Sequence, residues 1–217
     1  MRIHLNKDVH ACHNEKALAI HETLKQKNVT LINLVGSPGS GKTSLLECLI
    51  AHSSHNIGVI EGALFTDLDH QRIMKLGIPS YQLNTSGAFH LEPNSIEEAL
   101  KNFYLDDLDY IFIDNIGNLV CTASFYLGED LRVCVTSTTE GNDKPYKYPK
   151  MFYTSDIVVL NKLDLAPYTN FSIASFDEAI HQIHPEIHVI HTSCTQNDNS
   201  HELWKLLEEY HARKSSI

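Results

Sequence analysis

The stretch that most constrains the fold is residues 31–50, LINLVGSPGSGKTSLLECLI. An apolar run, a glycine-rich turn and a leucine-patterned segment follow one another, which predicts a buried strand, a tight loop and a helix. The turn has the pattern G-x-x-x-x-G-K-T, in which backbone N–H groups and the helix N-terminus converge on phosphate oxygens. The expected phosphate-binding residues are Gly36, Ser37, Pro38, Gly39, Ser40, Gly41, Lys42, Thr43 and Ser44.

Apolar runs and helical patterns alternate along the rest of the chain, which is typical of a mostly parallel sheet covered by helices on both faces. The expected strands are 30–35, 57–61, 80–84, 109–114, 131–136, 156–161 and 187–191. The expected helices are 8–27, 42–52, 67–76, 94–106, 172–183 and 200–213. Because no repeat or linker interrupts this alternation, we predict a three-layer α/β P-loop fold. One domain would span residues 1–217, with residues 1–28 as a helical extension packed on it.

Composition argues against several classes of partner. A net charge of −10 disfavours binding to nucleic acid or to anionic membranes, since both require a basic face. No apolar run approaches the roughly 18–20 residues of a membrane span, and the polar start is not typical of a signal peptide. Five cysteines without a C-x-x-C pair suit reduced thiols. We therefore expect a cytoplasmic protein without nucleic-acid or membrane partners.

Ligands of a parallel α/β sheet bind beyond the carboxyl ends of the strands, so the residues just after each strand indicate function. In the first loop, Lys42 should reach the β- and γ-phosphates and the Thr43 hydroxyl should bind Mg²⁺. The strand at 109–114 ends in Asp-Asn-Ile-Gly. Its Asp114 can hold Mg²⁺ and its Gly117 can sense the γ-phosphate. This pattern predicts a nucleoside triphosphate site.

The strand at 156–161 ends in Asn161-Lys162-Leu163-Asp164, which identifies the base. Guanine presents two donors that the carboxylate of Asp164 can accept, whereas adenine would leave this carboxylate unpaired, a difference of a few kcal/mol. The stem of Lys162 can lie over the base, and Asn161 can connect this loop to the phosphate loop. Ser193 and Cys194, after the last strand, are a plausible backbone contact to the base. The expected ligand is GTP or GDP.

Four further loops determine the family. They read IEGALFTDLDHQR at 60–72, NTSGAFHLEP at 84–93, IDNIGNLVC at 113–121 and EGNDKPYKYPKMF at 140–152. With the phosphate loop and NKLDL, they resemble HypB, the GTPase family that serves nickel insertion into [NiFe] hydrogenase. The resemblance covers the chain from about residue 5 onward. It implies a SIMIBI-type fold, a slow GTPase, a homodimer favoured by GTP, and hydrogenase-maturation proteins and the hydrogenase large subunit as partners.

The resemblance also implies a transition-metal site, formed in the family by a Cys-His pair after one strand and a cysteine after the next. The corresponding residues here are Phe89, His90 and Cys121. Imidazole and thiolate suit Ni²⁺ or Zn²⁺, but phenylalanine cannot coordinate a metal. In a symmetric dimer, two His90 and two Cys121 could still supply four ligands. The alternative is that His90 is an ordinary loop residue and Cys121 a small buried hydrophobe.

Other positions depart from the family pattern. Ala63 stands where the family usually has an aspartate near Mg²⁺ and the catalytic water, so we expect slow hydrolysis. Glu61 and Asp67 flank the same loop and could partly compensate, which makes Lys42, Glu61, Asp67 and Asp114 the expected catalytic residues. The family's cysteine-rich N-terminal motif is missing, and a local metal site of His10, Cys12 and His13 would lack a fourth ligand. The lysines of the 140–152 loop, which are expected near the nucleotide face, are Lys144, Lys147 and Lys150.

Two other functions stay open at this point. One is a guanine-nucleotide-gated binding paralogue with reduced GTPase activity and an altered or lost metal site, which Phe89 and Ala63 favour. The other is a general zinc-handling GTPase unconnected to hydrogenase. The sequence leaves open which metal is carried and which protein receives it.

Overall fold

A computed structural model describes residues 7–196 and 199–215, with side chains from residue 14 onward. The strands are β1 (Thr30–Gly36), β2 (Ile57–Ala63), β3 (Ser80–Asn84), β4 (Tyr110–Asp114), β5 (Leu131–Ser137), β6 (Ile157–Asn161) and β7 (His188–His191). The α-helices are α1 (Lys7–Gln26), α2 (Lys42–Ala51), α3 (Leu68–Met74), α4 (Pro93–Leu100), α5 (Lys144–Lys147), α6 (Pro149–Tyr153), α7 (Ile173–Ile183) and α8 (Ser200–Lys214). Short 3₁₀ helices are η1 (Leu105–Asp107), η2 (Thr122–Ser124) and η3 (Leu163–Tyr168).

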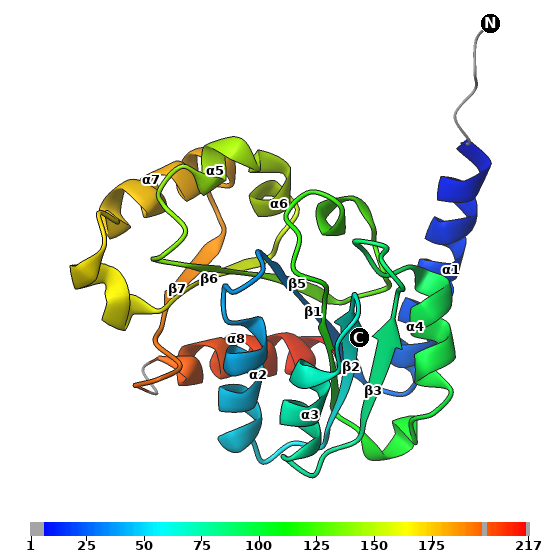
Figure 1. Ribbon diagram of the computed structural model, residues 1–217. Helices are drawn as coiled ribbons and strands as arrows, with labels where there is room; N and C mark the ends of the chain where they lie inside the picture. Colours follow the sequence, from blue (N-terminus) through cyan, green and yellow to red (C-terminus); the bar gives the residue numbers. More distant parts are fainter. Residues whose placement is uncertain (1–6, 197–198, 216–217) are drawn as a thin grey trace, which may run out of the picture.

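The strands form one parallel sheet in the order β3-β2-β4-β1-β5-β6-β7. Side chains alternate between its faces, so Ile32 and Leu34 of β1 pack with α2 and α8, whereas Leu31 packs on the opposite face with α1 and α4. Beside α1 and α4, a third cluster joins Val35 to α6 and α7. Figure 1 shows the resulting three layers. The predicted three-layer α/β P-loop architecture is confirmed.

The α1 helix packs on the sheet through Ile20 and Leu24, beside α4. Side chains of residues 7–13 lie outside the description, and with them the possible site of His10, Cys12 and His13. None of the helices in the described part of the chain is long and apolar enough to cross a bilayer.

One predicted helix was too long, and two short helices were not predicted. The helix expected at 94–106 ends at Leu100, because the Asn102 side chain donates to the carbonyl oxygen of Glu98 at 3.0 Å and terminates the turn. The loop at 140–152 contains the short helices α5 and α6, each with proline in its first turn, where the missing N–H costs nothing. The expected strands were found within two residues of their predicted bounds.

Candidate functional site

The phosphate loop runs from the end of β1 to the start of α2, and its glycines are required by close contacts. Gly36 has φ +150°, and a Cβ there would lie 2.1 Å from the Val135 carbonyl oxygen. Gly41 has φ +99°, and a Cβ there would lie 2.3 Å from Asn161 Nδ2. Only glycine fits at either position. The loop is therefore packed tightly between β5 and the residues after β6.

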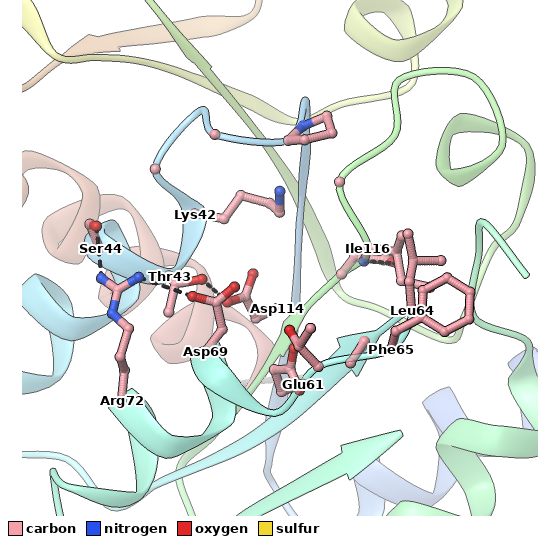
Figure 2. Close-up of a pocket in the computed structure, with 18 of the residues that line it drawn as sticks. Lys42, Thr43, Ser44, Glu61, Leu64, Phe65, Asp69, Arg72, Asp114 and Ile116 are labelled. Atoms are coloured by element: carbon pink, nitrogen blue, oxygen red, sulfur yellow. Dashed lines mark hydrogen bonds and ion pairs between the residues drawn. The ribbon is translucent and has the colours of Figure 1, made fainter. Parts of the chain in front are cut away.

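A cavity of about 570 Å³ opens beside this loop at the carboxyl ends of the strands (Figure 2). Its volume is in the usual range for small-molecule sites. It is lined by Pro38, Gly39, Gly41, Lys42, Thr43, Ser44, Glu61, Gly62, Ala63, Leu64, Phe65, Thr66, Asp69, Arg72, Asp114, Asn115, Ile116, Gly117 and Lys162. Six of the nine predicted phosphate-loop residues thus meet Glu61, Asp114 and Gly117 around one space. The other three, Gly36, Ser37 and Ser40, are not part of this lining. Asp67 is exposed outside this lining, where it accepts a hydrogen bond from Gln71 at 2.9 Å.

Thr43 and Asp114, the predicted Mg²⁺ residues, contact each other directly. The Thr43 hydroxyl donates to Asp114 Oδ2 at 2.6 Å, and both residues are buried. Burial raises the pKa of Asp114, while the nearby charge of Lys42 opposes this rise. Lys42 Nζ donates to the Ser37 carbonyl oxygen at 3.2 Å within the same loop. A hydroxyl, a carboxylate and an ammonium group therefore share one buried corner of the cavity.

Glu61 adds a second buried carboxyl group, only 5 % exposed. Burial raises its pKa to about 7; a hydrogen bond with Gln82 opposes this rise, and the charge of Asp114 adds to it. Its Oε2 atom is buried without a hydrogen-bond partner. An unpartnered buried carboxylate oxygen beside Thr43 and Asp114 is the kind of donor set that Mg²⁺ and its water ligands satisfy. The residues present fit a magnesium ion.

Asp69 and Arg72 also line the cavity, from α3, and sequence reasoning missed both. Arg72 Nη1 donates to Asp69 Oδ1 at 3.0 Å, while Nη2 donates to Ser44 Oγ at 2.9 Å and to Glu47 Oε2 at 2.6 Å. The sidechains of Asp69, Glu61 and Asp114 gather on one side of the cavity (Figure 2). The sequence did offer one indication of their role. Asp69 and Arg72 are three residues apart in the predicted helix 67–76, so their side chains lie on the same face of that helix.

The predicted base-recognition residues lie against the phosphate loop. Asn161 Nδ2 donates to the Ser40 carbonyl oxygen at 3.2 Å, and Lys162 Nζ donates to the Gly39 carbonyl oxygen at 2.6 Å. Lys162 has a left-handed backbone with φ 59°, which turns the chain sharply after β6.

The remaining residues predicted to contact the base, Asp164, Ser193 and Cys194, lie close to one another or to Asn161. Ser193 Oγ donates to Asp164 Oδ1 at 2.5 Å, which orients the carboxylate. The backbone N–H of Cys194 donates to Asn161 Oδ1 at 3.4 Å. The structure thus brings both predicted strand-end segments together, and their contact with guanine stays a prediction.

His90 and Cys121 lie on adjacent loops. The His90 ring stacks on the Phe125 ring with centroids 4.1 Å apart and planes 2° apart, and Phe125 follows Cys121 by four residues. His90 Nε2 also lies 3.6 Å from Glu92 Oε1. Phe89 is 55 % exposed. Among the described residues, no three His, Cys, Asp or Glu side chains are grouped closely enough to hold a metal ion. Within the described part of the chain, His90 and Cys121 are therefore not joined by a third potential ligand.

The three lysines of the 140–152 loop lie outside the lining of the described cavity. Lys144 Nζ lies 3.7 Å from Glu140 Oε2, Lys147 pairs with Asp143, and Lys150 Nζ donates to Ser124 Oγ at 3.0 Å. Their expected place near the nucleotide face stays a prediction.

The chain is similar to known proteins over most of its length. The family model for the CobW/HypB/UreG nucleotide-binding domain matches residues 30–191. The hydrogenase/urease maturation factor HypB of Helicobacter hepaticus is 40 % identical over 202 residues, covering 91 % of this chain and 84 % of that protein. The hydrogenase maturation factor HypB of Escherichia coli K12 is 43 % identical over 180 residues, covering 82 % of this chain and 62 % of that protein. The chain thus spans less than two thirds of the length of the latter relative.

A solved structure supports the same relationship. HypB from Helicobacter pylori, crystallised in complex with nickel, matches with a TM-score of 0.89 at 33 % identity, over 94 % of this chain and 97 % of that one. This match and the sheet order confirm the SIMIBI-type P-loop fold that the resemblance implied. The chain belongs to the CobW/HypB/UreG family and, within it, to the HypB maturation GTPases.

Proposed function

We propose that this protein is a GTP-hydrolysing metallochaperone that supplies nickel to [NiFe] hydrogenase, with its nucleotide state controlling dimerisation and metal release. Membership of the HypB family supports GTP hydrolysis and a role in hydrogenase maturation. The single observation that carries the proposal is that phosphate, base and cargo residues lie after strands of one parallel sheet. The nickel complex of the Helicobacter pylori relative supports nickel as the cargo.

The nucleotide would be held at both ends. Backbone N–H groups of the phosphate loop and the N-terminus of α2 would bind the phosphates. Asp164, oriented by Ser193, would accept hydrogen bonds from guanine, while the stem of Lys162 lies over the base. The backbone of Cys194 would border the base edge. The hydrogen bond from Asn161 to the Ser40 carbonyl oxygen would hold the base-binding loop against the phosphate loop.

Mg²⁺ would be held by Thr43 and Asp114, and when bound it neutralises charge on the phosphates. Lys42 would stabilise charge that develops on the γ-phosphate. Glu61, with a pKa of about 7, is able to accept a proton from the attacking water at neutral pH. Asp67 would assist only if its exposed loop closes over the nucleotide. Without an aspartate at Ala63, the resulting turnover is slow.

The cargo site would be shared by two chains. His90 and Cys121 from each subunit would supply two imidazoles and two thiolates across a two-fold axis, a set that suits Ni²⁺ and also Zn²⁺. Release of the metal would follow rearrangement of this region on GTP hydrolysis. We place this cycle in the cytoplasm, with hydrogenase-maturation proteins and the hydrogenase large subunit as partners.

A second candidate is a nucleotide-gated binding paralogue with reduced hydrolysis and a lost metal site. Two observations favour it. Phe89 exposes an apolar ring at the position of a metal ligand, and Ala63 lines the nucleotide cavity without a carboxylate. In this case the nucleotide would gate a protein surface instead of a metal.

Calorimetric titration of Ni²⁺ and of Zn²⁺ separates the two candidates. The protein is loaded with Mg²⁺ and a non-hydrolysable GTP analogue, and Cys121→Ala is compared with Cys48→Ala, a thiol outside the proposed site. The metallochaperone proposal expects one metal ion per two chains, lost in Cys121→Ala and kept in Cys48→Ala. Absence of binding, or binding unaffected by loss of Cys121, would favour the nucleotide-gated paralogue.

A further inference from the structure

The connection between β4 and β5, residues 115–130, carries both a nucleotide-facing end and Cys121. It is called the relay loop below. Its first residues line the nucleotide cavity, and Phe125 in its second half supports His90. The contacts of this loop indicate which residue links the nucleotide site to His90 and Cys121. This inference rests on the proposed function, in which these two side chains bind the metal.

The start of the relay loop is fixed to the phosphate loop. The backbone N–H of Asn118 donates to the Gly36 carbonyl oxygen at 2.9 Å. Gly117 lies so close that a Cβ there would sit 2.8 Å from Pro38 Cα. Any shift of the phosphate loop at Gly36 would therefore reach Asn118 directly.

The side chain of Asn118 continues this link to Cys121. Its Oδ1 accepts hydrogen bonds from the backbone N–H groups of Val120 at 2.7 Å and Cys121 at 2.8 Å. Its carbonyl oxygen accepts a hydrogen bond from the Thr122 hydroxyl. One residue thus holds the phosphate loop through its N–H and the turn that carries Cys121 through its side chain.

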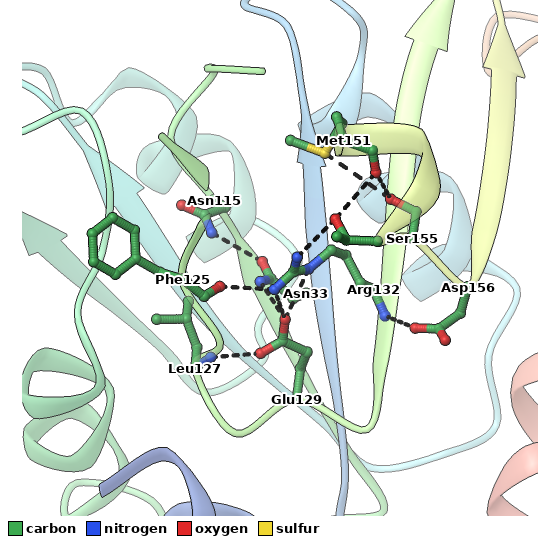
Figure 3. A network of polar contacts seen from close by, with 10 residues as sticks. Asn33, Asn115, Phe125, Leu127, Glu129, Arg132, Met151, Ser155 and Asp156 are labelled. Atoms are coloured by element: carbon green, nitrogen blue, oxygen red, sulfur yellow. Dashed lines mark hydrogen bonds and ion pairs between the residues drawn. The ribbon is translucent and has the colours of Figure 1, made fainter. Parts of the chain in front are cut away.

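The end of the relay loop is fixed to the sheet (Figure 3). Glu129 Oε1 accepts hydrogen bonds from Arg132 Nη2 at 2.6 Å and Asn33 Nδ2 at 3.2 Å. Arg132 Nη2 also donates to the Phe125 carbonyl oxygen at 2.7 Å. Glu129, Arg132 and Asn33 are all buried, so this network is shielded from water and its members bond to one another. Phe125 and the His90 ring stacked on it are therefore held in place.

These contacts anchor the segment that carries Cys121 at both ends, and its Leu119 and Ala123 are buried in the cluster with α6 and α7. Asn118 is tied to the phosphate loop, whereas Phe125 is tied to the buried ion pair. A displacement at Asn118 would act on Cys121, which is hydrogen-bonded to Asn118 and lies between these two points. We propose that Asn118 is the positioning residue that couples the phosphate loop to Cys121, so that the nucleotide changes the placement of the thiol relative to a fixed His90.

Alkylation of cysteines by iodoacetamide, resolved by peptide mass spectrometry, tests the coupling without any metal. The rate at Cys121 is measured in the whole protein with no nucleotide, with GDP, and with Mg²⁺ and a GTP analogue. In wild type, the alkylation rate at Cys121 should differ about fivefold or more between the GDP state and the GTP-analogue state. Asn118→Ala should bring this ratio close to one, whereas Asn118→Asp, which keeps the acceptor oxygen, should restore it.

Ser124→Ala is the matched control, because it removes a hydroxyl from the same turn without touching the link to Gly36. It should keep the wild-type ratio. Equal rates in wild type, or a full ratio in Asn118→Ala, would overturn the coupling. Hydrogen exchange at the Cys121 amide in wild type needs no variant, and protection unchanged by nucleotide would also overturn it. Nickel titration tests the proposed function separately, since neither readout here involves metal.

Discussion

Glu61 and Ala63 lie two residues apart on β2, so their side chains point to the same face of the strand and both line the nucleotide cavity. Glu61 supplies a carboxyl group whose pKa is raised to about 7, whereas Ala63, at a position where the resemblance to HypB implies aspartate, supplies only a methyl group. We therefore expect the rate of GTP hydrolysis to depend on how many ionised carboxylates line this cavity.

Ala63→Asp should raise the rate of GTP hydrolysis about tenfold or more, because it adds a carboxylate where the water and Mg²⁺ are positioned. Ala63→Asn, which adds similar volume without charge, is the control and should leave the rate low. Release of inorganic phosphate under single-turnover conditions measures both. Equal rates in the two variants would contradict the role assigned to this position.

Asp164→Asn should weaken GTP binding about 30- to 100-fold, since an amide group would face the guanine donors with its own donor. The same variant should gain affinity for xanthosine triphosphate, whose 2-oxo group accepts a hydrogen bond. Competition with a fluorescent guanine nucleotide measures both affinities. Unchanged GTP binding would show that Asp164 does not contact the base.

At the level of helices and strands, the sheet could be predicted from the alternation of apolar runs with helical patterns. Buried parallel strands are short apolar runs, and polar or glycine-rich motifs mark where they end. Residues after these strands, such as Lys42 and Asp114, could be predicted for the same reason. Asp69 and Arg72 could not, since they reach the cavity from a helix one turn beyond the loop. Asn118 was missed because its function depends on two backbone partners that no residue pattern encodes.

Two elements meet at Gly117, where the relay loop packs on the phosphate loop. Gly117→Ala would place a Cβ 2.8 Å from Pro38 Cα, so one of the two loops must shift. Overpacking of this kind costs about 1–3 kcal/mol, and GTP affinity should fall about tenfold or more. Gly77→Ala is the control. Gly77 has φ +73° but open space around it, so this variant should lower stability and leave GTP affinity unchanged. Equal affinities in the two variants would contradict the contact.

At the scale of the whole molecule, the raised pKa of Glu61 makes stability depend on pH. Because this pKa rises from 4.5 to about 7 on folding, the native state holds more protons than the unfolded state between these values. The stabilisation is complete below pH 4.5 and is lost as the pH rises through about 7. Asp114, whose pKa is also raised, acts in the same direction.

Urea unfolding of the nucleotide-free protein at pH 4.5 and pH 7.5 measures this dependence. The free energy of unfolding of wild type relative to Glu61→Gln should fall by up to about 3 kcal/mol between the two pH values. Parallel pH profiles for wild type and Glu61→Gln would show that folding leaves the pKa of Glu61 unchanged.

For the whole molecule, we propose that one edge of the sheet holds a nucleotide and a metal whose affinities depend on each other. The most direct measurement is the Ni²⁺ dissociation constant of the same protein with GDP and with a Mg²⁺-bound GTP analogue, determined by competition with a chromophoric chelator. In a nucleotide-controlled metallochaperone, the Ni²⁺ dissociation constants of the two nucleotide states should differ about fivefold or more. Identical constants in the two states would contradict nucleotide control of metal release.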